Sequence, residues 1–260
     1  MIDENMGLIV PRQVLSNFRH ALCVNNIINF NALDTAGRFG SGCLFPLHLY
    51  PHTEKGDLFK YKKEIQKKRP NISHVFLQTL SEVYKKEPTP EDILYYIYGV
   101  LYSNIYRAKY SEFLKTDFPR IPFTKNYKFF KGMGEYGKKL VDLHLLKSKD
   151  LDPPIAKFEG KGENKVERLT YEKAKVLINK EQHFEGISEQ VWKYQIGGYQ
   201  VCDKWLKDRK GQRLSLDDIK HYCKVVTAIK NTIEIQNKID NLYPEIEKEI
   251  IEFKNLKNKQ

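Results

Sequence analysis

Apolar residues in the first fifty positions occur in short runs that turn-forming residues separate, a pattern typical of β-strands. Asn25 and Asn26 form the turn after the second run. Pro46 lies inside the last run, and because proline has no N–H for a sheet ladder, this run lies at a sheet edge or ends there. The sequence therefore predicts a β-rich region over residues 1–50, with strands at 7–10, 20–24, 27–30 and 43–50.

From residue 58 to residue 147 apolar residues recur every three or four positions, which indicates helices. Thr89 is followed by Pro90 and two acidic residues, a combination typical of a helix N-terminus. Pro119 and Pro122 disfavour helix for themselves and for the residues before them, so the segment around them is extended. The predicted helices cover 72–84, the segment that Thr89 opens, the segment that Asn104 caps, and 125–147.

Residues 148–164 are polar and contain two prolines and two glycines, which predicts a loop. Beyond this loop the apolar runs become short again. They predict strands at 166–169, 174–179 and 192–196, a turn at Gly197 and Gly198, and a helix over 199–208.

The last part of the chain shows helical spacing once more. Ser215 and Asp218 form a capping box in which Asp stands where Glu or Gln is usual, and the helix that they start runs towards Asp240. Pro244 then starts or kinks a final helix. We therefore predict a long antiparallel or coiled-coil-like arm over residues 215–260.

Taken together, the patterns predict an α+β fold: a mixed β-sheet with an inserted helical region and long C-terminal helices. We expect one domain over residues 1–214, which is β-rich at 1–50, helical at 58–147 and β-rich again at 165–198. The helical arm over 215–260 is the second unit.

The net charge of +11 is distributed unevenly, since residues 55–69 carry +5, residues 120–150 carry +5, residues 203–213 carry +3, and the rest of the chain carries −2. Basic side chains that gather in a few segments fit a surface that contacts phosphates. Lysine-rich helix faces in solvent would give the same pattern, and both interpretations stay open.

Several classes of protein are disfavoured by the sequence. No apolar run approaches the roughly 20 residues that span a bilayer, and residues 1–5 are acidic where a secretory signal would be basic, so we expect a cytoplasmic protein without a membrane partner. The four cysteines form no Cys-x-x-Cys pair and are interpreted as buried thiols. Pro51 lies between His48 and His52, against the helix that would bring both to one metal, and we expect no metal site.

Three short motifs are candidate sites of chemistry. Gly132, Gly134 and Gly137 match G-x-G-x-x-G, but no buried strand precedes them, and we interpret them as a turn that opens the 138–147 helix. Residues 152–155 are similar to the Asp-Pro-Pro-aromatic motif of amino-methyltransferases, but Ile155 cannot stack on a base. Asp152, Glu159 and Lys161 match a nuclease pattern only at too short a spacing. We predict no catalytic, cofactor-binding or metal-binding residue.

Beyond single motifs, the chain resembles the C-terminal specificity (target-recognition) domain of type ISP restriction–modification enzymes, which are single-chain relatives of the type I systems. The segments that carry the resemblance lie in the expected order over nearly the whole chain: 7–13, 45–51, 90–103, 106–110, 117–123, 140–146 and 197–222.

This resemblance implies sequence-specific recognition of double-stranded DNA without a catalytic centre in this chain. Whole enzymes of the family carry nuclease, helicase-like and N6-adenine methyltransferase modules before this domain, and the chain lacks them. S-adenosylmethionine, ATP and Mg²⁺ are therefore expected only in those modules, and a methyltransferase module of the same or another chain is the expected partner. We expect an excised domain, a truncated gene product or a separate specificity subunit.

Candidate DNA contacts follow from the residue types that read bases and hold phosphates. Residues at turns of the N-terminal β region are the predicted base readers: Arg12, Gln13, Asn25, Asn26 and Arg38. Basic residues of two charged segments are the predicted phosphate contacts: Lys125, Lys128, Lys131, Lys204, Lys207, Arg209, Lys210 and Arg213. The helical tyrosines are interpreted as packing residues: Tyr95, Tyr96, Tyr98, Tyr102, Tyr106 and Tyr110. A metal-dependent nuclease fragment and a helical protein-interaction adaptor stay open as alternatives.

Overall fold

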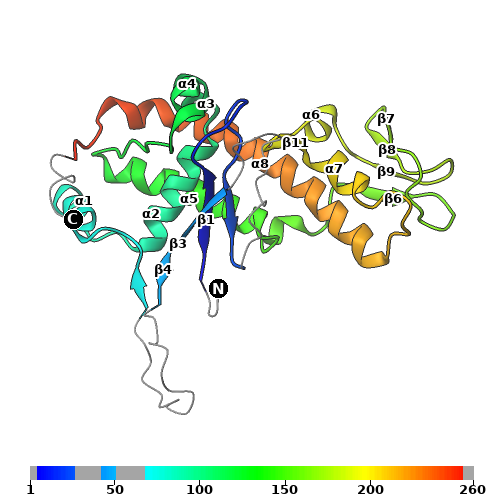
Figure 1. The fold of residues 1–260 in the computed structure, drawn as a ribbon, viewed down its shortest axis with the longest axis horizontal. Coiled ribbons are helices and arrows are strands. Elements are labelled where there is room, and N and C mark those ends of the chain that lie inside the picture. The colour runs from blue at the N-terminus through cyan, green and yellow to red at the C-terminus, as the bar shows by residue number, and fades with distance from the viewer. Residues whose placement is uncertain (1–4, 27–41, 51–67, 254–260) are drawn as a thin grey trace, which may run out of the picture.

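The computed structural model describes residues 5–26, 42–50 and 68–253. Their apolar side chains form two buried cores, which a single long helix, α8 (Leu216–Lys248), connects. We call the part around the first core the first lobe and the part around the second core the second lobe. In Figure 1 the first lobe lies on the left, the second on the right, and α8 passes from one to the other.

The sheet of the first lobe has the order β2–β1–β3, from β1 (Gly7–Pro11), β2 (Leu22–Val24) and β3 (Gly42–Pro46). Both neighbours pair antiparallel with β1, which is apolar and buried along its whole length because it is the central strand. Pro46 ends the edge strand β3, as predicted. A two-stranded ladder of β4 (His48–Leu49) and β5 (Arg69–Pro70) follows. The strand predicted at 27–30 lies outside the described residues.

The helices of the first lobe are α1 (His74–Tyr84), α2 (Pro90–Tyr102), α3 (Asn104–Lys109), α4 (Ser111–Thr116) and α5 (Tyr127–His144). Thr89 and Asp92 cap α2 reciprocally, which confirms the predicted start. The cap predicted at Asn104 is wrong. Ser103 occupies the cap position, and its hydroxyl accepts from the N–H of Tyr106 at 3.2 Å.

The glycines of the G-x-G-x-x-G string lie inside α5, so the predicted turn is wrong. Asn126 caps this helix, and α5 continues through all three glycines to His144. A Cβ on Gly137 would lie 1.8 Å from the carbonyl oxygen of Tyr95, and one on Gly99 would lie 2.8 Å from that of Met133. Gly99 and Gly137 are therefore required by the close approach of α2 and α5.

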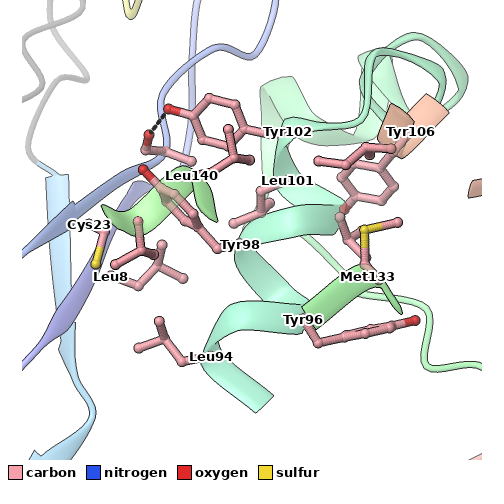
Figure 2. Close-up of a cluster of buried hydrophobic side chains, with 14 of the residues drawn as sticks. Leu8, Cys23, Leu94, Tyr96, Tyr98, Leu101, Tyr102, Tyr106, Met133 and Leu140 are labelled. Atoms are coloured by element: carbon pink, nitrogen blue, oxygen red, sulfur yellow. Dashed lines mark hydrogen bonds between the residues drawn. The ribbon is translucent and has the colours of Figure 1, made fainter. Parts of the chain in front are cut away.

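The tyrosines of α2 and α3 pack in the first core, as predicted. Tyr96, Tyr98, Tyr102 and Tyr106 are at most 1% exposed. Figure 2 shows Tyr98 beside Leu8 and Cys23 of the sheet, and the Tyr102 hydroxyl donates to the Ala21 carbonyl at 3.0 Å. Those of Tyr96 and Tyr106 donate to the carbonyls of Pro122 (2.6 Å) and Arg120 (3.0 Å). These bonds attach the strands and the extended 118–123 segment to the helices.

The second lobe holds an antiparallel sheet of order β6–β9–β8–β7, and every strand in it has three residues. Its elements are η1 (Lys149–Leu151), β6 (Lys157–Glu159), β7 (Thr170–Glu172), β8 (Lys175–Leu177), β9 (His183–Glu185), α6 (Glu189–Trp192), β10 (Gln195–Ile196), β11 (Tyr199–Gln200) and α7 (Val201–Lys207).

Several boundaries predicted for this lobe are wrong. Residues 148–164 contain η1 and β6 in addition to loop, and 166–169 forms no strand because Val166 bonds to the loop residues Gly211 and Gln212. The predicted strand at 192–196 begins as the last residue of α6, since the hydroxyl of Ser188 caps a single helical turn. The Gly197–Gly198 turn between β10 and β11 is as predicted.

The helix α8 begins at the capping box of Ser215 and Asp218, as predicted, and continues through Pro244 to Lys248. A helix restarted at Pro244 is therefore wrong. The domain division at residue 215 stays a prediction, although α8 contributes Tyr222 and Val226 to the second core and Ile239 and Tyr243 to the first. No helix in the described part of the chain has the length and apolar character needed to span a membrane.

Candidate nucleic-acid interface

Arg12 and Gln13 directly follow β1 and are both exposed. The Arg12 guanidinium donates to Asp117 at 3.3 Å, and the Gln13 amide donates to the Thr116 carbonyl at 3.2 Å. The Phe118 N–H and the Arg12 guanidinium together hold the pKa of Asp117 below its usual range. Both predicted readers are thus positioned against the end of α4. Their contacts lie at the surface and are weak enough to be replaced by contacts with a ligand.

Asn25 and Asn26 form an exposed bend after β2. Because β2 runs antiparallel to β1 and Val24 pairs with Gly7, this bend lies at the opposite end of the sheet from Arg12. The five residues of β1 span about 17 Å at about 3.4 Å per residue. The structure therefore does not bring the two pairs of predicted readers together, and Arg38 lies outside the described residues.

Three predicted phosphate contacts surround the start of α5. Lys125 and Lys128 are exposed, whereas Lys131 is half-buried and donates to Asp92 at 2.8 Å. This hydrogen bond raises the pKa of Lys131. Burial opposes ionisation of Asp92, but its bonds from Lys131 and Thr89 prevail and hold its pKa below the usual range. Lys131 is therefore engaged within the first lobe, between α5 and the cap of α2.

The other five predicted phosphate contacts lie in the second lobe, in and after α7, and most of them have acidic partners. Lys204 pairs with Asp208, and Lys207 pairs with Asp203. The Arg209 Nε lies 3.4 Å from Asp218 Oδ1, and its guanidinium carbon lies 3.5 Å from the centre of the Trp205 ring. Arg213 pairs with Glu163. In the part of the chain that the structure describes, Lys210 forms no ion pair, and it lies in the exposed turn before Gly211.

Sequence reasoning missed a cleft of about 390 Å³ between the two lobes. We call it the inter-lobe cleft; its basic residues are Arg19, which precedes β2, Arg107 on α3, and Lys193 after α6. These residues belong to segments far apart in the sequence. No local pattern links them, and the only sequence signal is their charge.

The residues of the nuclease-like pattern have separate surroundings. Asp152 pairs with Lys224 of α8 at 2.9 Å, and Glu159 is exposed on β6. Over the described ranges, no group of three His, Cys, Asp or Glu side chains is arranged to hold a metal ion. Cys23, Cys202 and Cys223 are buried, as predicted, while Cys43 is half-buried.

In a comparison with protein families, the Type ISP C-terminal specificity domain matches residues 1–238. No curated protein matches the chain.

Solved structures share the fold. The ATP-dependent Type ISP restriction-modification enzyme LlaBIII bound to DNA superimposes with a TM-score of 0.69 at 21% identity, over 92% of this chain and 16% of that one. A nuclease-deletion mutant of the Type ISP enzyme LlaGI with a DNA substrate mimic gives 0.62 at 20% identity, over 91% and 18%. The DrdV–DNA complex gives 0.69 at 17% identity, over 92% and 25%. The chain thus spans a quarter or less of the length of each of these neighbours.

Proposed function

Since the chain belongs to the Type ISP C-terminal specificity domain family, we propose that it recognises a specific sequence in double-stranded DNA for a restriction–modification enzyme. The family match over residues 1–238 is the observation that carries this proposal. The structural neighbours are bound to DNA or to a DNA substrate mimic, which supports duplex DNA as the partner.

The chemistry of the side chains indicates which residues would read bases and which would contact phosphates. Arg and Gln side chains read base edges in the major groove, so Arg12 and Gln13 are the proposed readers at the sheet end beside α4, and Asn25 and Asn26 at the other end. Lysines contact phosphates without regard to sequence and supply most of the affinity. Lys210 is the proposed anchor of the second lobe because it would lose no ion pair within the described residues on binding.

In this proposal the chain itself carries no catalytic step. Methyl transfer from S-adenosylmethionine and Mg²⁺- and ATP-dependent cleavage belong to other modules, with a methyltransferase module as the protein partner. Labelled methyl transfer by the isolated chain, or Mg²⁺-dependent strand breakage that Glu159→Ala abolishes, contradicts this part.

DNA binding is tested with the purified chain and a random-sequence duplex library, titrated with salt. We expect binding whose log K falls with log salt at about −0.9 per phosphate contact, and enrichment of one asymmetric sequence motif over successive rounds. A slope near zero, or binding without enrichment of any motif, overturns the proposal.

A further inference from the structure

The inter-lobe cleft has an unusual balance of polar groups. Its lining carries three cationic side chains, five carboxamides and no carboxylate. Carboxamides and guanidinium groups together offer many N–H donors at fixed positions. A cleft of about 390 Å³ is large enough for one anionic group but not for a DNA duplex.

The two arginines of the cleft are held in place by neutral partners. One Nη of Arg19 donates to the Gln195 carboxamide at 2.7 Å. The Nε of Arg107 donates to the Leu101 carbonyl at 2.6 Å, and its guanidinium lies 4.7 Å from the centre of the Tyr102 ring. A guanidinium has five N–H donors, so each of these contacts leaves donors for a ligand.

The neighbouring carboxylates have partners other than the two arginines. Glu189 pairs with Lys193, the third cation of the cleft, and Asp240 accepts from Ser103 and from the backbone and side chain of Asn104. In the described part of the chain neither Arg19 nor Arg107 forms an ion pair, in contrast with most of the basic residues after α7. The cleft therefore holds two guanidinium charges that no carboxylate neutralises.

The charge of the two arginines affects the ionisation of His20 beside them. Burial, together with the charges of Arg107 and Arg19, lowers the pKa of His20 to about 4. Gln236 is buried, accepts from the Tyr194 hydroxyl at 3.1 Å and donates to the Tyr102 carbonyl at 3.0 Å. Two hydrogen bonds thus hold the buried Gln236 in place, and a lining of fixed polar groups beside two guanidinium charges favours an anion.

We propose that the inter-lobe cleft binds one phosphate group of the DNA backbone, with Arg19 and Arg107 as its principal contacts. Planar guanidinium groups match the geometry of phosphate oxygens and bind them through paired hydrogen bonds. The inference rests on the proposed function, because DNA supplies the phosphate. It places a phosphate contact at the junction of the two lobes, where the sequence predicted none.

The test compares Arg19→Gln and Arg107→Gln with Arg168→Gln, a control at an exposed arginine outside the cleft. Thermal unfolding checks that each variant folds; this matters most for Arg107→Gln, which also loses the bond to Leu101. We expect each cleft variant to bind duplex DNA about tenfold more weakly at low salt, with a salt slope reduced by no more than the value of about 0.9 for one phosphate contact, and the control to match wild type.

A second measurement reports on the arginines directly. Phenylglyoxal modification, mapped by mass spectrometry, should show Arg19 and Arg107 protected by duplex DNA and Arg168 unprotected. Equal protection by free dAMP at the same phosphate concentration overturns the assignment to the DNA backbone.

The two proposals fail in different ways. Wild-type chain that does not bind DNA overturns both the proposed function and the cleft assignment. Salt-dependent DNA binding that both cleft variants retain at wild-type strength, with neither arginine protected, overturns the cleft assignment alone.

Discussion

Replacing Gly137 by alanine should destabilise the protein, although alanine is the better helix former. A Cβ at this position would lie 1.8 Å from the carbonyl oxygen of Tyr95 and 2.7 Å from its carbonyl carbon. Both are backbone atoms of α2, so they cannot rotate away as a side chain would. The helices α2 and α5 must separate, and the first core that they enclose loses its packing.

Gly134 in the same helix is the matched control. A Cβ there would lie 3.7 Å from the Asp92 carbonyl oxygen, which is an ordinary van der Waals contact. Gly134→Ala should therefore gain the helix propensity of about 0.5–1 kcal/mol. Gly137→Ala gains the same propensity but incurs overpacking of about 1–3 kcal/mol or more, so we expect a net loss of roughly 2 kcal/mol.

Thermal unfolding followed by far-UV circular dichroism measures the difference. At about 2–4 °C per kcal/mol for a protein near this size, the midpoint of Gly137→Ala should fall by roughly 4–8 °C, and that of Gly134→Ala should rise slightly. A Gly137→Ala variant as stable as wild type would refute the close approach of the two helices.

Three further predictions follow from other contacts. Asp240→Ala removes the carboxylate that accepts from the N–H groups of Asn104 and Ile105 at the start of α3 and should cost about 1–3 kcal/mol in urea unfolding, whereas Asp217→Ala, at an exposed position in the first turn of α8, should cost under about 1 kcal/mol. Burial, with the charge of Arg107 in addition, lowers the pKa of His144 to about 3, so the unfolded chain takes up a proton that the folded chain refuses as pH falls below 6.5. The unfolding free energy should drop by about 1–2 kcal/mol more in wild type than in His144→Gln between pH 6.5 and 5, and equal losses would contradict the assignment. In DNA binding, Arg12→Ala should cost about 1–3 kcal/mol on the selected sequence and little on random DNA, while Lys210→Ala should weaken both equally.

Features that a few neighbouring residues determine could be predicted from the sequence. The caps at Thr89 and Ser215, the edge strand that ends at Pro46 and the turn at Gly197 all depend on local backbone chemistry. They mark where these particular elements begin and end.

Features that depend on distant contacts could not be predicted. The three-residue strands of the second lobe are too short to show alternation, and α5 continues through Gly137 because α2 lies against it. The candidate site follows the same rule. Antiparallel pairing places Asn25 far from Arg12, and the inter-lobe cleft joins Arg19 to Arg107 only in three dimensions.

The position of α8 has a consequence for biosynthesis. Its 33 residues extend about 50 Å, and they contribute buried side chains to both cores. Translation proceeds at about 5–20 residues per second, so the strands and the other helices of both lobes leave the ribosome before α8 has been synthesised. Neither core can close until α8 has emerged, so the two lobes complete their folding together, and a fragment that stops before Ser215 leaves both cores open to solvent.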